Sequence, residues 1–110
     1  MMKKRSLKDL EEKITIARTK KQKARAYYKL GLFHDNNSRE IKAIPYYKKA
    51  IVFGLDKPTK AKALAYLASS MYKTNNSKKA IKKLNTALKI TKNIKLRKFL
   101  LRLKNKIKTL

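Results

Sequence analysis

His34 is the only imidazole in the chain, and the carboxylate of Asp35 follows it directly. A histidine that a carboxylate orients can act as a general base, but adjacent residues on a helix do not face each other. His34 also continues a helically spaced series of packing residues, Tyr27, Leu30 and Gly31. We therefore expect a core or solvated histidine rather than a catalytic pair.

The carboxylates are few and scattered, at Asp9, Glu11, Glu12, Asp35, Glu40 and Asp56. Metal binding requires several carboxylates or histidines that converge, whereas acids near the start of a helix are explained by the helix dipole. Cysteine is absent, which excludes thiolate metal sites, disulfides and a cysteine nucleophile. The sequence has no glycine-rich phosphate loop and no nucleophile elbow. We expect no enzyme activity, no cofactor, no metal and no small-molecule substrate.

Positive charge dominates the composition. The chain has 32 Lys and Arg residues against 6 acids, a formal net charge of +26, and no acid follows Asp56. Such a charge attracts polyanions, which include nucleic acid, acidic proteins and anionic lipid surfaces. The alternative is the codon usage of an AT-rich genome, which favours Lys, Asn and Ile. That alternative explains less well why the second half lacks acids altogether.

No targeting or membrane segment is visible in the sequence. The basic start, Met1 to Arg5, is not followed by the apolar core of a signal peptide. No apolar run approaches the roughly 18 residues that span a bilayer. We therefore expect a soluble, cytoplasmic protein, and the lack of cysteine is compatible with a reducing compartment.

The length of 110 residues predicts one small domain, and two Gly and two Pro favour long helices over tight turns. Apolar spacing predicts a leading helix at 6–23, with Ser6 as its N-cap. Whether this helix is continuous with the next stays open. Helix pairs are predicted within 24–57 and 61–93, and a last helix at 94–110.

Asparagine-rich turns are predicted to separate the helices of each pair. At Asn36-Asn37-Ser38, asparagine tolerates the left-handed conformation and Ser38 can cap the following helix. Asn75-Asn76-Ser77 has the same three residues. In the last helix an apolar stripe is expected to pack on the preceding helix, although such a stripe can also contact membranes or acidic grooves. The stripe consists of Leu96, Leu100, Leu103, Ile107 and Leu110.

The two predicted helix pairs align with each other at an offset of 37 residues. Large residues fall on large ones and small residues on small ones: Ala24 on Ala61, Tyr27 on Leu64, Leu30 on Leu67, Gly31 on Ala68, His34 on Met71, Ala43 on Ala80, Tyr47 on Leu84 and Ala50 on Ala87. This self-similarity predicts a repeat of helical hairpins, in which small residues stand where two helices approach closely.

The pattern Tyr27-x2-Leu30-Gly31-x2-His34-x8-Ala43-x3-Tyr47-x2-Ala50 resembles the tetratricopeptide repeat. The resemblance implies an all-α fold of antiparallel helix hairpins, stacked in a right-handed superhelix and closed by a capping helix at 94–110. The chain departs from the family in its period, which is 37 residues rather than about 34. Its second copy also lacks aromatic residues at the matching core positions.

By the same resemblance, the first helix of each pair lines a concave groove. Its exposed positions would be Arg25, Tyr28, Leu32, Asp35 and Asn36 in the first repeat, and Lys62, Ala65, Ser69, Tyr72 and Lys73 in the second. The alternative for Tyr28 and Tyr72 is packing against flanking helices. A separate basic surface is predicted at Lys78, Lys79, Lys82, Lys83, Lys98 and Arg102.

We therefore expect a non-catalytic protein-interaction module, a scaffold or adaptor that binds an acidic protein partner. The alternative is sequence-independent binding of RNA or DNA through the basic C-terminal half. A peripheral membrane contact is not expected.

Overall fold

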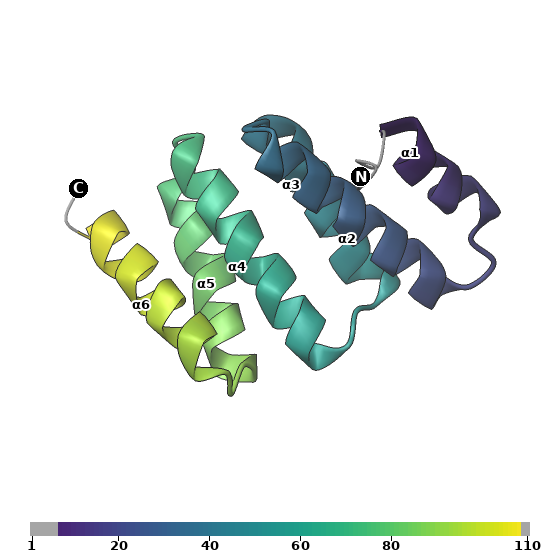
Figure 1. Ribbon diagram of the computed structural model, residues 1–110. Coiled ribbons are helices and arrows are strands. Elements are labelled where there is room, and N and C mark those ends of the chain that lie inside the picture. The colour runs from purple at the N-terminus through teal and green to yellow at the C-terminus, as the bar shows by residue number, and fades with distance from the viewer. Residues whose placement is uncertain (1–6, 109–110) are drawn as a thin grey trace, which may run out of the picture. The chain divides into compact units, whose positions relative to one another are not determined.

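A computed structural model describes residues 7–108, and this part of the chain is all-α, as predicted. Its helices are α1 (Leu7–Ile16), α2 (Lys20–Asn36), α3 (Glu40–Phe53), α4 (Lys57–Lys73), α5 (Ser77–Ile90) and α6 (Ile94–Lys108) (Figure 1). Ser6, the predicted N-cap, and Leu110, the last residue of the predicted stripe, lie outside the described residues.

The helices form two compact units, which divide between Leu55 and Asp56. In unit 1, α2 and α3 form an antiparallel hairpin, and α1 packs on α2 (Figure 1). In unit 2, α4 and α5 form the hairpin, and α6 packs on both of its helices. Leu100, Leu103 and Ile107 of α6 are buried, so the apolar stripe of this helix packs within unit 2.

The hairpins of the two units have the same dimensions. Each has a first helix of 17 residues and a second helix of 14 residues. Both helices of the α4–α5 hairpin begin and end 37 residues after their counterparts in the α2–α3 hairpin, which is the offset found in the sequence. Seven of the eight aligned pairs are buried in both hairpins, and the exception is the pair of Tyr27, which is half-buried, and Leu64.

Gly31 is the residue that allows α2 and α3 to approach closely. A Cβ atom at this position would lie 2.6 Å from Cδ1 and Cε1 of the Tyr47 ring. The aligned residues of unit 2 are Ala68 and Leu84, both fully buried. A larger residue at the glycine position is thus accompanied by a smaller one at the tyrosine position, as close packing requires.

The turn inside each hairpin closes by the same hydrogen bonds. Arg39 N donates to His34 O at 2.8 Å, and Asn76 N donates to Met71 O at 2.7 Å. In each turn the residue before the donor has a left-handed conformation, with φ of 58° at Ser38 and 65° at Asn75. These are Schellman motifs, which satisfy carbonyl groups at a helix C-terminus.

The predicted cap at Ser38 is therefore wrong. Ser38 takes the left-handed position, and α3 begins after Arg39, which makes no side-chain cap hydrogen bond. The two Asn-Asn-Ser triplets begin at 36 and 75, so they stand 39 residues apart and do not occupy equivalent places in hairpins that repeat at 37. The same triplet therefore occupies different positions in two turns that share one backbone geometry.

The leading helix also ends earlier than the predicted residue 23, because a capping box at Thr19 starts a new helix. Thr19 Oγ1 accepts a hydrogen bond from Gln22 N at 3.0 Å. Gln22 Oε1 accepts in return from Thr19 N at 3.3 Å and from Arg18 N at 2.8 Å. The Thr-x-x-Gln spacing that marks such a box is visible in the sequence.

Candidate interaction surfaces

A hollow of about 310 Å³ lies between α1 and α2 in unit 1. We call it the α1–α2 hollow, and it is lined by Lys13, Ile16, Ala17, Gln22, Arg25, Ala26 and Lys29. Its apolar part includes Ile16, which is 71% exposed. Three of the lining residues are cationic and none is acidic, so the hollow combines apolar and cationic lining residues.

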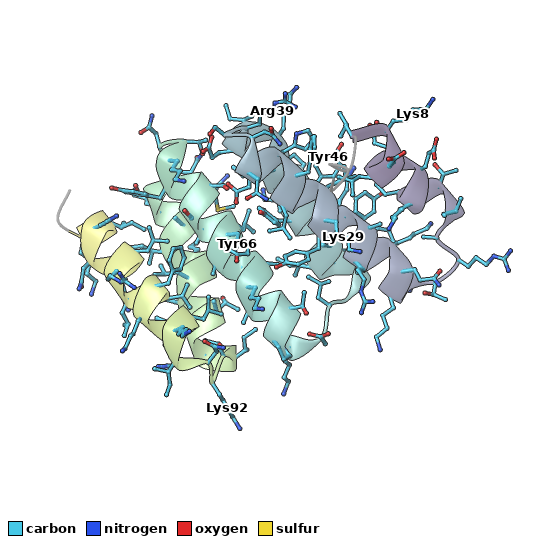
Figure 2. The ribbon with its side chains drawn as sticks, viewed as in Figure 1. Lys8, Lys29, Arg39, Tyr46, Tyr66 and Lys92 are labelled. Carbon is cyan, nitrogen blue, oxygen red and sulfur yellow. The ribbon has the colours of Figure 1, made fainter. Side chains whose placement is uncertain are left out.

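Local structure brings these side chains together. The capping box at Thr19 turns the chain between α1 and α2, so that the end of α1 lies beside the start of α2 (Figure 1). Lys13 and Ile16 are three residues apart on α1, and Arg25 and Lys29 are four apart on α2. These spacings place each pair on one helix face. Figure 2 shows Lys29 projecting from the middle of α2.

The predicted groove residues of unit 1 differ in their surroundings. Arg25 is exposed and lines the α1–α2 hollow, whereas Tyr28, Leu32 and Asp35 are half-buried. Tyr47 Oη donates a hydrogen bond to Asp35 Oδ2 at 2.9 Å. The Tyr28 ring lies 6.2 Å from the Tyr47 ring, centroid to centroid. Tyr28 and Asp35 thus take part in packing the hairpin.

In unit 2, the predicted groove residues Lys62 and Lys73 are exposed, and Ser69 and Tyr72 are half-buried. Ala65 is fully buried, so the prediction that its side chain is exposed is wrong. The aligned residue in unit 1, Tyr28, is partly open to solvent. A groove that both units share stays a prediction.

Unit 1 also contains a row of stacked rings, which sequence reasoning did not find. His34 stacks on Tyr46 at 5.4 Å, Tyr46 on Tyr27 at 6.2 Å, and Tyr27 on Phe53 at 5.5 Å, between ring centroids. Lys49 Nζ lies 5.4 Å from the centroid of Tyr27. The rings alternate between α2 and α3 and join the two helices of the hairpin.

His34 closes this row and is only 4% exposed. Burial lowers its pKa below 6.5, and the positive charges of Arg39 and Lys42 lower it further, while Glu11 opposes them. Among the described residues, its Nδ1 atom has no hydrogen-bond partner. His34 is therefore a neutral packing residue at pH 7, as expected for its place in the repeat.

A second hollow, of about 630 Å³, lies at one end of unit 2. We call it the lysine hollow, because Lys57, Lys62, Lys89 and Lys92 line it, together with Pro58, Ile90, Thr91, Asn93 and Leu96. The residues come from the start of α4, the end of α5, the connection that follows it and the start of α6. Sequence reasoning missed the hollow because its two pairs of lysines are about 30 positions apart in the chain.

The predicted basic surface lies elsewhere on unit 2. Lys78, Lys79 and Lys82 on α5 are exposed, as are Lys98 and Arg102 on α6, while Lys83 is half-buried. None of these six residues lines the lysine hollow. Unit 2 thus has cations both in a hollow and on open helix faces.

Comparison with protein-family models, curated proteins and solved structures finds no match to the chain. The proposed function therefore rests on the surfaces of the two units.

Within residues 7–108, no helix is long and apolar enough to cross a membrane. In the same range, no group of three or more histidine, aspartate or glutamate side chains could hold a metal ion.

Proposed function

We propose that the chain is a non-catalytic protein-interaction module of the tetratricopeptide type, and that the α1–α2 hollow binds an acidic segment of a protein partner. The observation that carries this proposal is the exposed Ile16 surrounded by Lys13, Arg25 and Lys29. When a partner covers an exposed isoleucine, the burial stabilises the complex by about 25 cal/mol per Å² of apolar area.

The three cationic lining residues select which partner can cover the apolar ones. An arginine guanidinium can bind a carboxylate through two parallel hydrogen bonds, and Arg25 is exposed at the edge of the hollow. Lysine ammonium groups add attraction without a fixed direction. A segment with one apolar side chain between Asp or Glu residues matches both features.

The tetratricopeptide assignment is supported by the two hairpins. They share helix lengths, turn hydrogen bonds and buried small residues at the spacing found within one copy of that repeat, although they recur after 37 residues. In such arrays a helix that flanks the repeats covers the apolar side of the neighbouring hairpin. We assign α1 and α6 this covering role, and α1 then forms one wall of the binding hollow.

The proposal is tested with a displayed library of random peptides, from which the wild-type protein selects ligands. The selected peptides should carry acidic residues on both sides of a single apolar residue. Ile16→Ser should weaken binding of a selected peptide about tenfold, because the apolar contact is lost, an estimate that corresponds to about 1.4 kcal/mol.

Ile41→Ser is the matched control, since Ile41 is 74% exposed on the same unit but lies outside the α1–α2 hollow. It should leave the affinity unchanged. Selected peptides without acidic residues, or equal affinity for wild type and Ile16→Ser, would contradict the proposal.

A further inference from the structure

We propose that the lysine hollow of unit 2 is a binding site for the phosphate backbone of single-stranded RNA or DNA. This activity goes beyond the protein binding proposed above and uses a different unit. The hollow brings Lys57 and Lys62 of α4 together with Lys89 at the end of α5 and Lys92 in the connection to α6. In Figure 2, Lys92 projects from the connection between α5 and α6 into solvent.

The ammonium groups of these lysines are available to a ligand. All four lysines are exposed, and no acidic residue lines the hollow. The nearest acid in the sequence, Asp56, accepts a hydrogen bond from Thr59 N at 2.8 Å and so caps the start of α4. No acid follows it in the chain.

The negative end of α5 is compensated by another residue. Arg97 Nη1 donates to Leu88 O at 2.7 Å and to Thr91 O at 3.2 Å, at the C-terminal end of α5. The lysines of the hollow are therefore not required to bind these carbonyl groups. Two helices, α4 and α6, also begin at the hollow, and the positive ends of their dipoles add to the attraction for an anion.

The charge of the whole unit favours a polyanion over a single acidic side chain. From Asp56 onward there are 17 Lys and Arg residues against one acid, so the net charge of unit 2 is 17 − 1 = +16. A nucleic-acid backbone carries one negative charge on each nucleotide, and neutralising such charges releases counterions. Cations beside the hollow, such as Lys95 on α6, can bind the phosphates that follow along the strand.

The test is a titration of labelled single-stranded RNA of arbitrary sequence with the protein. Fluorescence anisotropy monitors binding at several salt concentrations. Wild-type protein should bind, and log K should fall linearly with log salt. The double variant Lys62→Ala/Lys92→Ala should bind about tenfold more weakly near physiological salt. Its salt slope should be smaller by about 1.4, since each phosphate contact on a single strand contributes about 0.7.

The matched control is Lys79→Ala/Lys82→Ala, which removes the same charge from an exposed face of α5 outside the hollow. It should change the affinity less than threefold. Equal losses in the two double variants would show that only net charge acts and would overturn the site. Absence of binding at physiological salt would also overturn it.

A competitor separates nucleic acid from acidic protein. Polyglutamate of equal charge should displace the RNA much less effectively than unlabelled RNA does. Equal displacement would overturn the assignment to a phosphate backbone. Thermal unfolding should show the two double variants equally stable and no less stable than wild type, because all four substituted lysines are exposed and each variant loses two mutually repelling charges.

Discussion

His34 is a titratable residue at a buried packing position. Its ring lies parallel to that of Tyr46, at an interplanar angle of 8°, and is nearly inaccessible to water. At the aligned position of the other hairpin stands Met71, also buried. The comparison shows that the position requires volume and shape, while the protonation of the imidazole is an additional property of unit 1.

Because burial and then the charges of Arg39 and Lys42 lower the pKa of His34, folding should become weaker in acid. The unfolded chain binds a proton near pH 6.5, whereas the folded chain binds it only at lower pH. The contribution to stability is thus full above pH 6.5 and is lost as the pH falls from there to the folded-state pKa.

This prediction can be measured by urea unfolding of wild type and His34→Met between pH 7.5 and 4.5. The stability difference between the two proteins should shift against wild type as the pH falls, by at most about 1.4 kcal/mol per pH unit. A difference that stays constant with pH would show that His34 titrates alike in both states.

At the scale of the helices, apolar spacing was sufficient to predict the core of each hairpin. Ala43, Tyr47 and Ala50 were expected to pack and are fully buried. Ile41 is also apolar but is 74% exposed, since a residue in the first turn of a helix can extend past the end of its partner. Its aligned residue is Lys78, a poor candidate for the core.

Helix ends and sites were harder to predict than helix cores. Helix ends depend on short-range hydrogen bonds, such as those of the Schellman turn at Ser38. The lysine hollow depends on lysines that come together only after the chain has folded back. No local sequence pattern connects the pair Lys57 and Lys62 with the pair Lys89 and Lys92, which line that hollow. Of the residues that line the α1–α2 hollow, only Arg25 was predicted from the sequence as a binding residue.

The capping box at Thr19 should stabilise the start of α2 and the corner that shapes the α1–α2 hollow. Thr19→Ala removes the oxygen that accepts from Gln22 N and should cost about 1 kcal/mol in unfolding free energy. Urea unfolding followed by circular dichroism measures this cost. Thr15→Ala, within α1 and also exposed, should be neutral or slightly stabilising, because alanine favours the helix. If the two substitutions changed the unfolding free energy equally, the capping box would have no role in stability.

The net charge of +26 acts on every part of the molecule at once. Like charges repel each other and favour the expanded, unfolded chain. The cation–π contacts of Lys49 and Lys23 with aromatic rings relieve a little of this repulsion in unit 1. In unit 2 a bound polyanion would relieve it far more, so nucleic-acid binding and folding stability should be coupled.

Added salt should therefore stabilise this protein, in contrast to a protein held together by surface ion pairs. The Debye length falls to about 10 Å at 0.1 M salt, so most of the increase in Tm should occur below that concentration. Thermal unfolding in sodium chloride measures the effect, and Lys82→Glu/Lys98→Glu, which lowers the net charge by four, should reduce it. At equal ionic strength, phosphate should raise the Tm of wild type more than chloride does. Lys62→Ala/Lys92→Ala should reduce this excess to the part that comes from exclusion of phosphate from the protein surface. A Tm that falls as salt is added would mean that attraction between charges outweighs their repulsion in the folded chain.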